Sequence, residues 1–292
     1  MSQKRDFSKT ATLIWVAVFL SALPFEISKA TSIDSVTAGK IQQAQRLTIS
    51  GQRRQGQLIL IEALSDKQTS SEERPKLVEG INQISRNFLT DRAQAAFESG
   101  ESLFFSGNRA ESLKRYREAL ELEPENTQII AALGRNLLAE NNCGEARGQA
   151  EEGLSINPYD SELLILKARL DLCRDLSAQG RSQWEEEVKA LEAEFSFEVS
   201  WYRLILEENQ GIKKSIPTLA RKLLKEDPQF PEPLYLLWKH SPQSPARRNW
   251  AASYITTCKK SDQMFLRRYK NEPRVCSWVK VLEEALAKGS GS

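Results

Sequence analysis

The chain has 292 residues, of which 40% are apolar and 27% are charged, and its formal net charge is +2. This apolar content excludes a disordered chain and is enough for a large buried core. A charge near zero, without clustered basic and aromatic residues, argues against a nucleic-acid-binding protein, because phosphate neutralisation dominates that affinity.

The first thirty residues have the pattern of a secretory signal peptide. Three basic residues precede an apolar run over residues 11–23, which is too short to cross a membrane comfortably. Ser28-Lys29-Ala30 offers a small-x-small site, so we expect cleavage after Ala30 and a periplasmic or secreted mature protein. Removal of this segment takes away four basic and two acidic residues and leaves 37 of each. The alternative is an uncleaved N-terminal membrane anchor.

Residues 31–91 are expected to form helices. Apolar and small residues recur at helical spacing from Thr37 to Leu64, which predicts a helix pair. A polar stretch from Gln68 to Glu73 predicts a loop, and KLVEGINQISRNFL, from Lys76 to Leu89, predicts one additional helix.

Residues 92–160 contain the clearest internal repeat. YREALELEPEN ends a predicted helix at Pro124, and the similar stretch ARGQAEEGLSINPYD ends one at Pro158, 34 residues later. Proline cannot continue a helix, so it ends one and helps to start the next. Small residues recur at the same interval, as in Gly100 and Gly134, where they would let two antiparallel helices approach closely.

Taken together, these residues resemble the tetratricopeptide repeat (TPR). The resemblance is strongest over residues 93–160 and extends more weakly from Thr37 to about Lys260, with a degenerate first repeat in residues 31–91. It implies an all-α fold, a right-handed superhelix or α-solenoid of about five stacked antiparallel helix pairs followed by a C-terminal capping helix.

The remaining segments continue this organisation. Residues 161–260 predict three degenerate pairs, and residues 261–288 predict two capping helices, DQMFLRRYK and EPRVCSWVKVLEEALAK. Asn271 is the expected N-cap of the second capping helix, with Pro273 in its first turn. Residues 289–292, GSGS, are expected to be a flexible tail or a cloning scar.

The resemblance also implies a binding groove on the concave surface, formed by the first helix of each pair. An apolar groove with a few charges would suit an amphipathic or aromatic-bearing segment. For Phe104 and Phe105 the alternative is packing between neighbouring units. Carried over position by position, the groove residues are Gln94, Phe97, Glu101, Phe104, Phe105, Gln128, Ala131, Arg135, Leu138, Glu162, Ile165, Arg169 and Trp201.

Four cysteines in an exported chain are first read as disulfides. Cys143 and Cys173 fall at positions that stacked repeats bring to one edge, and a short helix that folds back would join Cys258 to Cys276. We therefore expect the pairs Cys143–Cys173 and Cys258–Cys276, with free buried thiols as the alternative.

No pattern indicates catalysis. His240 is the one histidine, there is no CxxC, and the motifs of nucleophilic hydrolases, P-loop proteins and zinc proteases are absent. We therefore expect no enzyme, no cofactor and no metal, and no nucleic-acid partner.

Export, repeats and the lack of catalytic motifs favour a scaffold or adaptor that binds another protein of the cell envelope through its concave groove. A second hypothesis starts from residues 246–292, which hold ten basic and four acidic residues. This region would either be a solvated capping surface or let a non-catalytic module of an envelope machine contact an anionic cell-wall polymer. A third hypothesis keeps the N-terminal segment as a membrane anchor.

Overall fold

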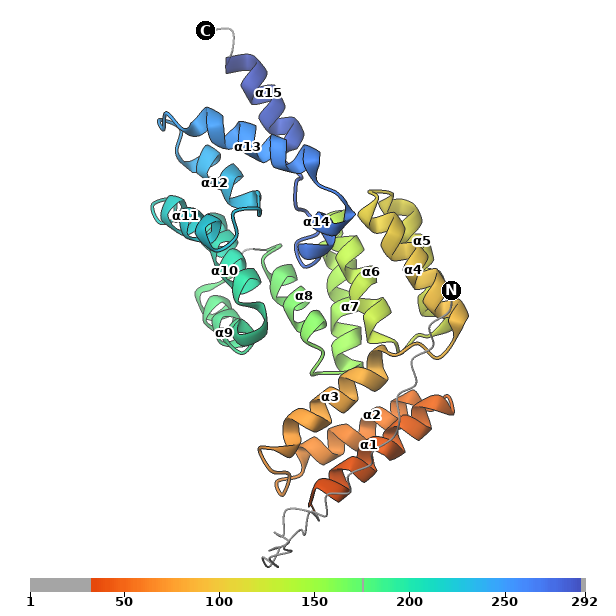
Figure 1. The fold of residues 1–292 in the computed structure, drawn as a ribbon. Coiled ribbons are helices and arrows are strands. Elements are labelled where there is room, and N and C mark those ends of the chain that lie inside the picture. The colour runs from red at the N-terminus through yellow and green to blue at the C-terminus, as the bar shows by residue number, and fades with distance from the viewer. Residues whose placement is uncertain (1–32, 175, 290–292) are drawn as a thin grey trace, which may run out of the picture.

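The computed structural model describes residues 33–174 and 176–289, and the expected signal peptide with its cleavage site therefore lies outside the described residues. The described residues form fifteen helices and no strand (Figure 1). Their bounds are α1 Ile33–Ile49, α2 Arg53–Ser65, α3 Glu73–Arg86, α4 Asp91–Phe105, α5 Arg109–Leu122, α6 Thr127–Ala139, α7 Cys143–Ile156, α8 Ser161–Asp171, α9 Ala178–Lys189, α10 Glu192–Asn209, α11 Ile216–Glu226, α12 Glu232–His240, α13 Arg247–Lys260, α14 Gln263–Arg268 and α15 Val279–Gly289.

Helices α1, α2 and α3 form an N-terminal three-helix unit with its own apolar core, which includes Leu60 and Ile81. Two arginines join this unit to the repeats. Arg53 of α2 forms a buried ion pair with Glu123, at 2.7 Å, and Arg86 of α3 pairs with Asp160, at 2.6 Å. Both acids lie in the turns that end a helix pair, so the additional helix α3 is held against the ends of the repeats.

The pairs α4/α5 and α6/α7 form where the repeat signal is strongest. Each first helix starts at a side-chain cap: Thr90 accepts from Ala93 N, and Asn126 accepts from Gln128 N. Asp160 caps α8 in the same way. Because each cap follows the end of the previous second helix by only a few residues, the chain reverses at a regular interval and neighbouring pairs stack.

Three further pairs follow, α8/α9, α10/α11 and α12/α13, and they share one large apolar core. The first helix of the α10/α11 pair begins at Glu192, and a kink at Phe195 joins two helical stretches within it. Helices packed in adjacent pairs are consistent with an α-solenoid.

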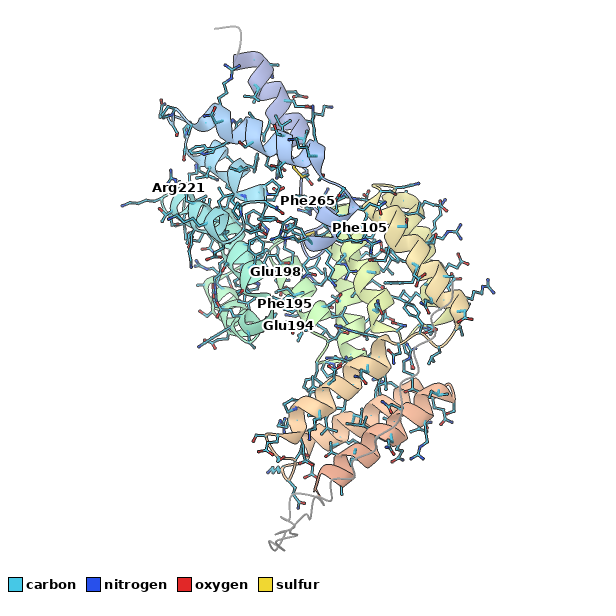
Figure 2. All side chains as sticks on the ribbon, viewed as in Figure 1. Phe105, Glu194, Phe195, Glu198, Arg221 and Phe265 are labelled. Carbon is cyan, nitrogen blue, oxygen red and sulfur yellow. A yellow bond between two sulfur atoms is a disulfide. The ribbon has the colours of Figure 1, made fainter. Side chains whose placement is uncertain are left out.

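The C-terminal region differs from the sequence prediction. The expected helix from Glu272 to Lys288 forms only from Val279 onward, and Asn271 and Pro273 lie in a turn rather than at a helix start. After α13 the chain turns back into the hollow of the solenoid, forms the short helix α14, and returns to α15 (Figures 1 and 2). Within the described part of the chain, no helix combines the length and apolar character needed to cross a membrane.

Gly134 lies where α6 packs closely against α8. A Cβ atom there would stand 2.7 Å from Leu166 Cδ2, whereas a Cβ at Gly148, on the exposed side of α7, would meet nothing within 4 Å. We therefore expect Gly134→Ala to lower the free energy of unfolding by about 1–3 kcal/mol, because the neighbour must move. Gly148→Ala should raise the free energy of unfolding by about 1 kcal/mol through helix propensity. Urea unfolding measures both, and equal effects of the two changes would contradict this packing.

Candidate functional site

The concave surface of the solenoid holds residues 262–278, which we call the inserted segment. This segment contacts the first helix of four successive pairs, α4, α6, α8 and α10. It also reaches the last pair, where Cys276 N donates to Glu232 Oε1 of α12, at 2.7 Å, and Trp278 N donates to Tyr254 Oη of α13, at 3.1 Å. The chain thus fills the middle of its own groove.

A buried ion pair fixes the centre of the inserted segment. Arg169 of α8 donates from Nε to Glu272 Oε2, at 2.7 Å, and from Nη2 to Oε1, at 3.3 Å. Trp201 Nε1 also donates to Glu272 Oε2, at 2.9 Å. The two charged side chains are only 7% and 6% exposed. Burial alone would raise the pKa of Glu272, but the charge of Arg169 and its hydrogen bonds outweigh it and lower that pKa, so the pair is ionised.

Further contacts hold the segment on both sides of this pair. Lys270 pairs with Glu162 Oε1, at 2.7 Å, and Tyr269 donates its hydroxyl to Asp227 Oδ2, at 2.8 Å. The Arg267 guanidinium lies over the ring of Phe105, 4.8 Å from its centroid. In the pairs of Lys270 with Glu162 and of Arg268 with Asp227 the acid lies on the repeats and the base on the inserted segment, the reverse of the Arg169–Glu272 pair.

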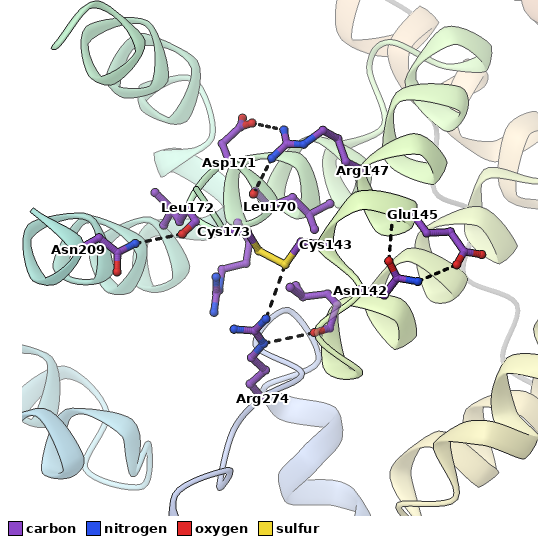
Figure 3. Close-up of a disulfide and its surroundings, with 12 residues drawn as sticks. Asn142, Cys143, Glu145, Arg147, Leu170, Asp171, Leu172, Cys173, Asn209 and Arg274 are labelled. Atoms are coloured by element: carbon purple, nitrogen blue, oxygen red, sulfur yellow. Dashed lines mark hydrogen bonds and ion pairs between the residues drawn. A yellow bond between two sulfur atoms is a disulfide. The ribbon is translucent and has the colours of Figure 1, made fainter. Parts of the chain in front are cut away.

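Both disulfides border the inserted segment, and they are the two pairs expected from the sequence. Cys258–Cys276 joins the end of α13 to the segment, with 5.5 Å between the Cα atoms. Cys143–Cys173 joins α7 to the end of α8, and Arg274 of the segment donates to Cys143 Sγ, at 3.6 Å (Figure 3). The disulfides indicate an oxidising, exported environment.

The inserted segment leaves a cavity on each side. The first, of about 260 Å³, lies against α4, α6 and α8, and we call it the N-terminal cavity. Its charged residues pair mostly with one another: Arg135 is 3.0 Å from Glu162 and 3.5 Å from Glu101. Burial favours a raised pKa for Glu162, but Arg135 and Lys270 outweigh it and lower the pKa to about 2. The cavity is lined by Phe97, Glu98, Glu101, Gln128, Arg135, Glu162, Arg267 and Lys270.

The second cavity, of about 410 Å³, lies between the inserted segment and α8, α10 and α12, and we call it the C-terminal cavity. Its walls include Trp201 and the stacked rings of Tyr235 and Trp278, whose centroids are 4.4 Å apart with an interplanar angle of 1°. Its charged lining residues are Arg169, Glu208, Glu232, Lys239, Glu272 and Arg274.

Most of the groove residues inferred from the resemblance lie along this surface. Five line the N-terminal cavity: Phe97, Glu101, Gln128, Arg135 and Glu162. Arg169 and Trp201 line the C-terminal cavity, and Phe104 and Phe105 lie against the inserted segment between the two.

Many of these side chains are nevertheless covered, so only some of them are accessible along the groove. Ile165 and Leu138 are fully buried, Ala131 lies in a small apolar cluster, and Phe97 packs against Phe88 and Tyr116. Gln94 is exposed but lies outside both cavities, where it donates to Glu98. Phe104 and Phe105 are both part of a buried apolar cluster, which agrees with the packing alternative for these two residues.

Sequence reasoning missed the residues that the inserted segment contributes, above all Glu272, Arg274 and Trp278, and it missed Glu232 and Tyr235 of α12. The left-handed backbone conformation of Cys276, with φ 68°, interrupts the helical pattern and is visible only in the structure. The signal present in the sequence was the excess of basic residues in the C-terminal region, because two of them, Arg268 and Lys270, pair with acids of the repeats.

In the described ranges no three histidine, cysteine, aspartate or glutamate side chains gather as metal ligands. His240 Nε2 lies 3.0 Å from Glu208 Oε1, in contact with a neighbouring helix. The chain matches no protein-family model and no curated protein, so its function has to be argued from these cavities and the inserted segment.

Replacing Glu272 tests how the inserted segment is held. Glu272→Ala would leave the buried Arg169 charge without its partner, and we expect the free energy of unfolding to fall by about 3–5 kcal/mol. Amide hydrogen exchange should become faster in residues 262–278 than in α4 or α6. Glu284→Ala, at an exposed position on α15, is the matched control. Unchanged hydrogen exchange in Glu272→Ala would contradict the central role of the Arg169–Glu272 pair.

A second buried acid gives a stability change with pH. Glu232 Oε1 accepts from Tyr254 Oη, at 2.8 Å, as well as from Cys276 N. Burial raises the pKa of Glu232 from 4.5 to about 8. Between these values the folded chain keeps a proton that the unfolded chain has lost, so this group's stabilising contribution is complete below pH 4.5 and is lost as the pH rises through about 8.

We therefore expect Glu232→Gln to remove a decline in the free energy of unfolding of up to about 1.4 kcal/mol per pH unit between pH 5 and about 8. The amide oxygen of glutamine can still accept both hydrogen bonds, so the fold should be kept. Urea unfolding at several pH values in wild type and variant measures the difference. Parallel pH curves for the two proteins would show that Glu232 ionises normally.

Proposed function

We propose that the protein is an exported scaffold of TPR-like helix pairs, in a right-handed superhelix, that binds a segment of another cell-envelope protein against its concave face. The observation that carries this proposal is the inserted segment itself. The concave face holds residues 262–278 through ion pairs, aromatic contacts and hydrogen bonds from several first helices. A surface that binds this polypeptide has the chemistry to bind another segment beside it.

The two cavities define where a partner would enter. Each is bounded by first helices on one side and by the inserted segment on the other, so a partner segment would contact both. The half-buried Gln128 and the exposed Arg267 give the N-terminal cavity an accessible polar rim. Aromatic walls over a few charged groups favour a polypeptide over a small polar substrate.

The charge distribution favours this proposal over contact with an anionic polymer. Of the basic residues after Ala246, Arg268 pairs with Asp227, Lys270 with Glu162 and Lys259 with Glu283. These pairs reduce the positive charge available to a polymer. An uncleaved N-terminal anchor would be compatible with the same concave site.

A non-catalytic role is part of the proposal. Glu232, whose pKa burial raises to about 8, uses one oxygen to hold Tyr254 and the inserted segment. Its side chain is largely enclosed, and the residue is only 3% exposed. These contacts give Glu232 a role in positioning the segment.

The test is to block each cavity from residues that carry no core packing. Gln128→Trp would fill the N-terminal cavity and Ser277→Trp the C-terminal cavity, while Gln83→Trp on the exposed face of α3 is the matched control. We expect at least one cavity variant to reduce recovery of a crosslinked partner from native envelopes at least about tenfold, a loss of about 1.4 kcal/mol of binding free energy. Melting temperatures should stay close to wild type. Recovery that is unchanged in both cavity variants would overturn binding at the concave face.

A further inference from the structure

The C-terminal cavity contains one arginine whose charge is not matched. Arg169 pairs with Glu272, and Lys239 pairs with Glu208, at 2.7 Å in both cases. Arg274 instead donates from Nε to Leu138 O, at 3.3 Å, and from Nη2 to Cys143 Sγ, at 3.6 Å. Within the described part of the chain it forms no ion pair with a carboxylate, and both of its acceptors are uncharged.

The surroundings make this lack of a partner costly. Arg274 is half-buried at the cavity wall, and burial together with the nearby charge of Arg169 lowers its pKa more than the charge of Glu272 raises it. A guanidinium group has five N–H donors, of which two are used here, one of them with a weak sulfur acceptor. A partly desolvated cation beside a second cation is stabilised by an anion, and the fork of donors suits a carboxylate.

The acids of the cavity are already engaged. Glu272 receives both donors of Arg169 and the indole N–H of Trp201. Glu208 contacts Lys239 and His240. Glu232 is held by Tyr254 and the backbone of Cys276, and burial keeps it largely protonated at neutral pH. The cavity therefore carries one positive charge without a partner, and it lies on Arg274.

The size and walls of the cavity fit a peptide side chain rather than a bare ion. Its volume of about 410 Å³ lies in the range of ligand sites. Trp278 is 39% exposed and stacks on Tyr235, which gives an aromatic wall. Asn141, exposed at the cavity edge, supplies an amide that can bond to a peptide backbone. Asn209 lies at the same edge and donates from Nδ2 to Leu172 O, at 3.0 Å, which leaves its amide oxygen as an acceptor.

We propose that the C-terminal cavity binds a carboxylate side chain on an acidic segment of the partner protein, with Arg274 as its anion-binding residue. This inference rests on the proposed function and adds the chemistry of the partner. The occupant is a polypeptide whose acidic side chain enters beside the inserted segment while its backbone follows the concave face. Arg274 reaches the site because the inserted segment carries it there, so the segment is part of the binding surface.

The test uses the full chain and a fluorescent hexaglutamate peptide, acetylated at its N-terminus and amidated at its C-terminus, with hexaglutamine as the uncharged control. Fluorescence anisotropy gives the affinity. We expect hexaglutamate to bind more tightly than hexaglutamine, and Arg274→Gln to weaken hexaglutamate binding about tenfold, the size of a lost charge-assisted hydrogen bond. Arg92→Gln, which removes an exposed arginine of α4, should change the affinity less than about twofold, as screening of distant surface charges predicts.

A second variant covers a folding defect in Arg274→Gln, which circular dichroism would reveal. Trp278→Ala removes the exposed aromatic wall and should also weaken hexaglutamate binding. Equal binding of the two peptides, or equal hexaglutamate affinity in wild type and in a folded Arg274→Gln protein, would overturn the anion site. Displacement of hexaglutamate by millimolar acetate would overturn it as well, because a small-ion site would then explain the binding.

If the anion site is overturned while the cavity-blocking variants still reduce partner recovery, the concave scaffold stands without an acidic partner. If hexaglutamate does not bind through Arg274 and the cavity-blocking variants leave partner recovery unchanged, the proposed function is overturned too.

Discussion

The buried pair between Arg169 and Glu272 is the contact on which the arrangement of the concave face depends. Neither charge could be buried alone, since an unpaired ion in this environment would cost several kcal/mol. Each therefore requires the other, although their residues are 103 positions apart in the chain. The pair places residues 262–278 across the middle of the groove.

Such a pair fixes the position of the inserted segment more than it adds net stability. The cost of removing both ions from water offsets much of their attraction, so an apolar pair of the same volume could be as stable. The ions instead fix the orientation of the inserted segment. The two N–H donors of Arg169 and the indole N–H of Trp201 converge on one carboxylate, and few arrangements of the segment satisfy all of them. The division of the groove into two cavities follows from that placement.

The helical pairs could be predicted from sequence because their determinants are local. Pro124 and Pro158 end second helices, and Asn126 and Asp160, a few residues later, cap the next first helices. Each of these signals acts within one turn of chain. The helices α5 and α7 accordingly end at Leu122 and Ile156, two residues before these prolines.

The C-terminal region could not be predicted in the same way because distant contacts override its local pattern. The stretch from Glu272 to Trp278 has residues at spacings compatible with a helix, yet Glu272 and Val275 are buried against other helices. Cys276 is held in a left-handed conformation, an arrangement that costs about 1 kcal/mol or more for a residue with a side chain. The disulfide to Cys258 and the hydrogen bond from Cys276 N to Glu232 maintain it.

The groove residues illustrate the same limit. The repeat pattern assigned Arg135, Glu162, Arg169 and Trp201 to the groove, and these residues line the two cavities. It could not indicate which of them remain accessible, because accessibility depends on what else occupies the hollow. The basic residues of the C-terminal region held part of that information, but charge composition alone does not distinguish a solvated surface from pairs with Glu162 and Asp227.

The disulfide at the base of the inserted segment determines how a partner would meet it. A free C-terminal tail could leave the groove and be replaced by a partner, whereas residues between Cys258 and Cys276 form a closed loop whose two ends remain near the last helix pair. The closure reduces the entropy of the released loop and so favours its return to the groove. A partner then gains more by adding to this surface than by replacing it, and an oxidising compartment would be needed to keep the surface complete.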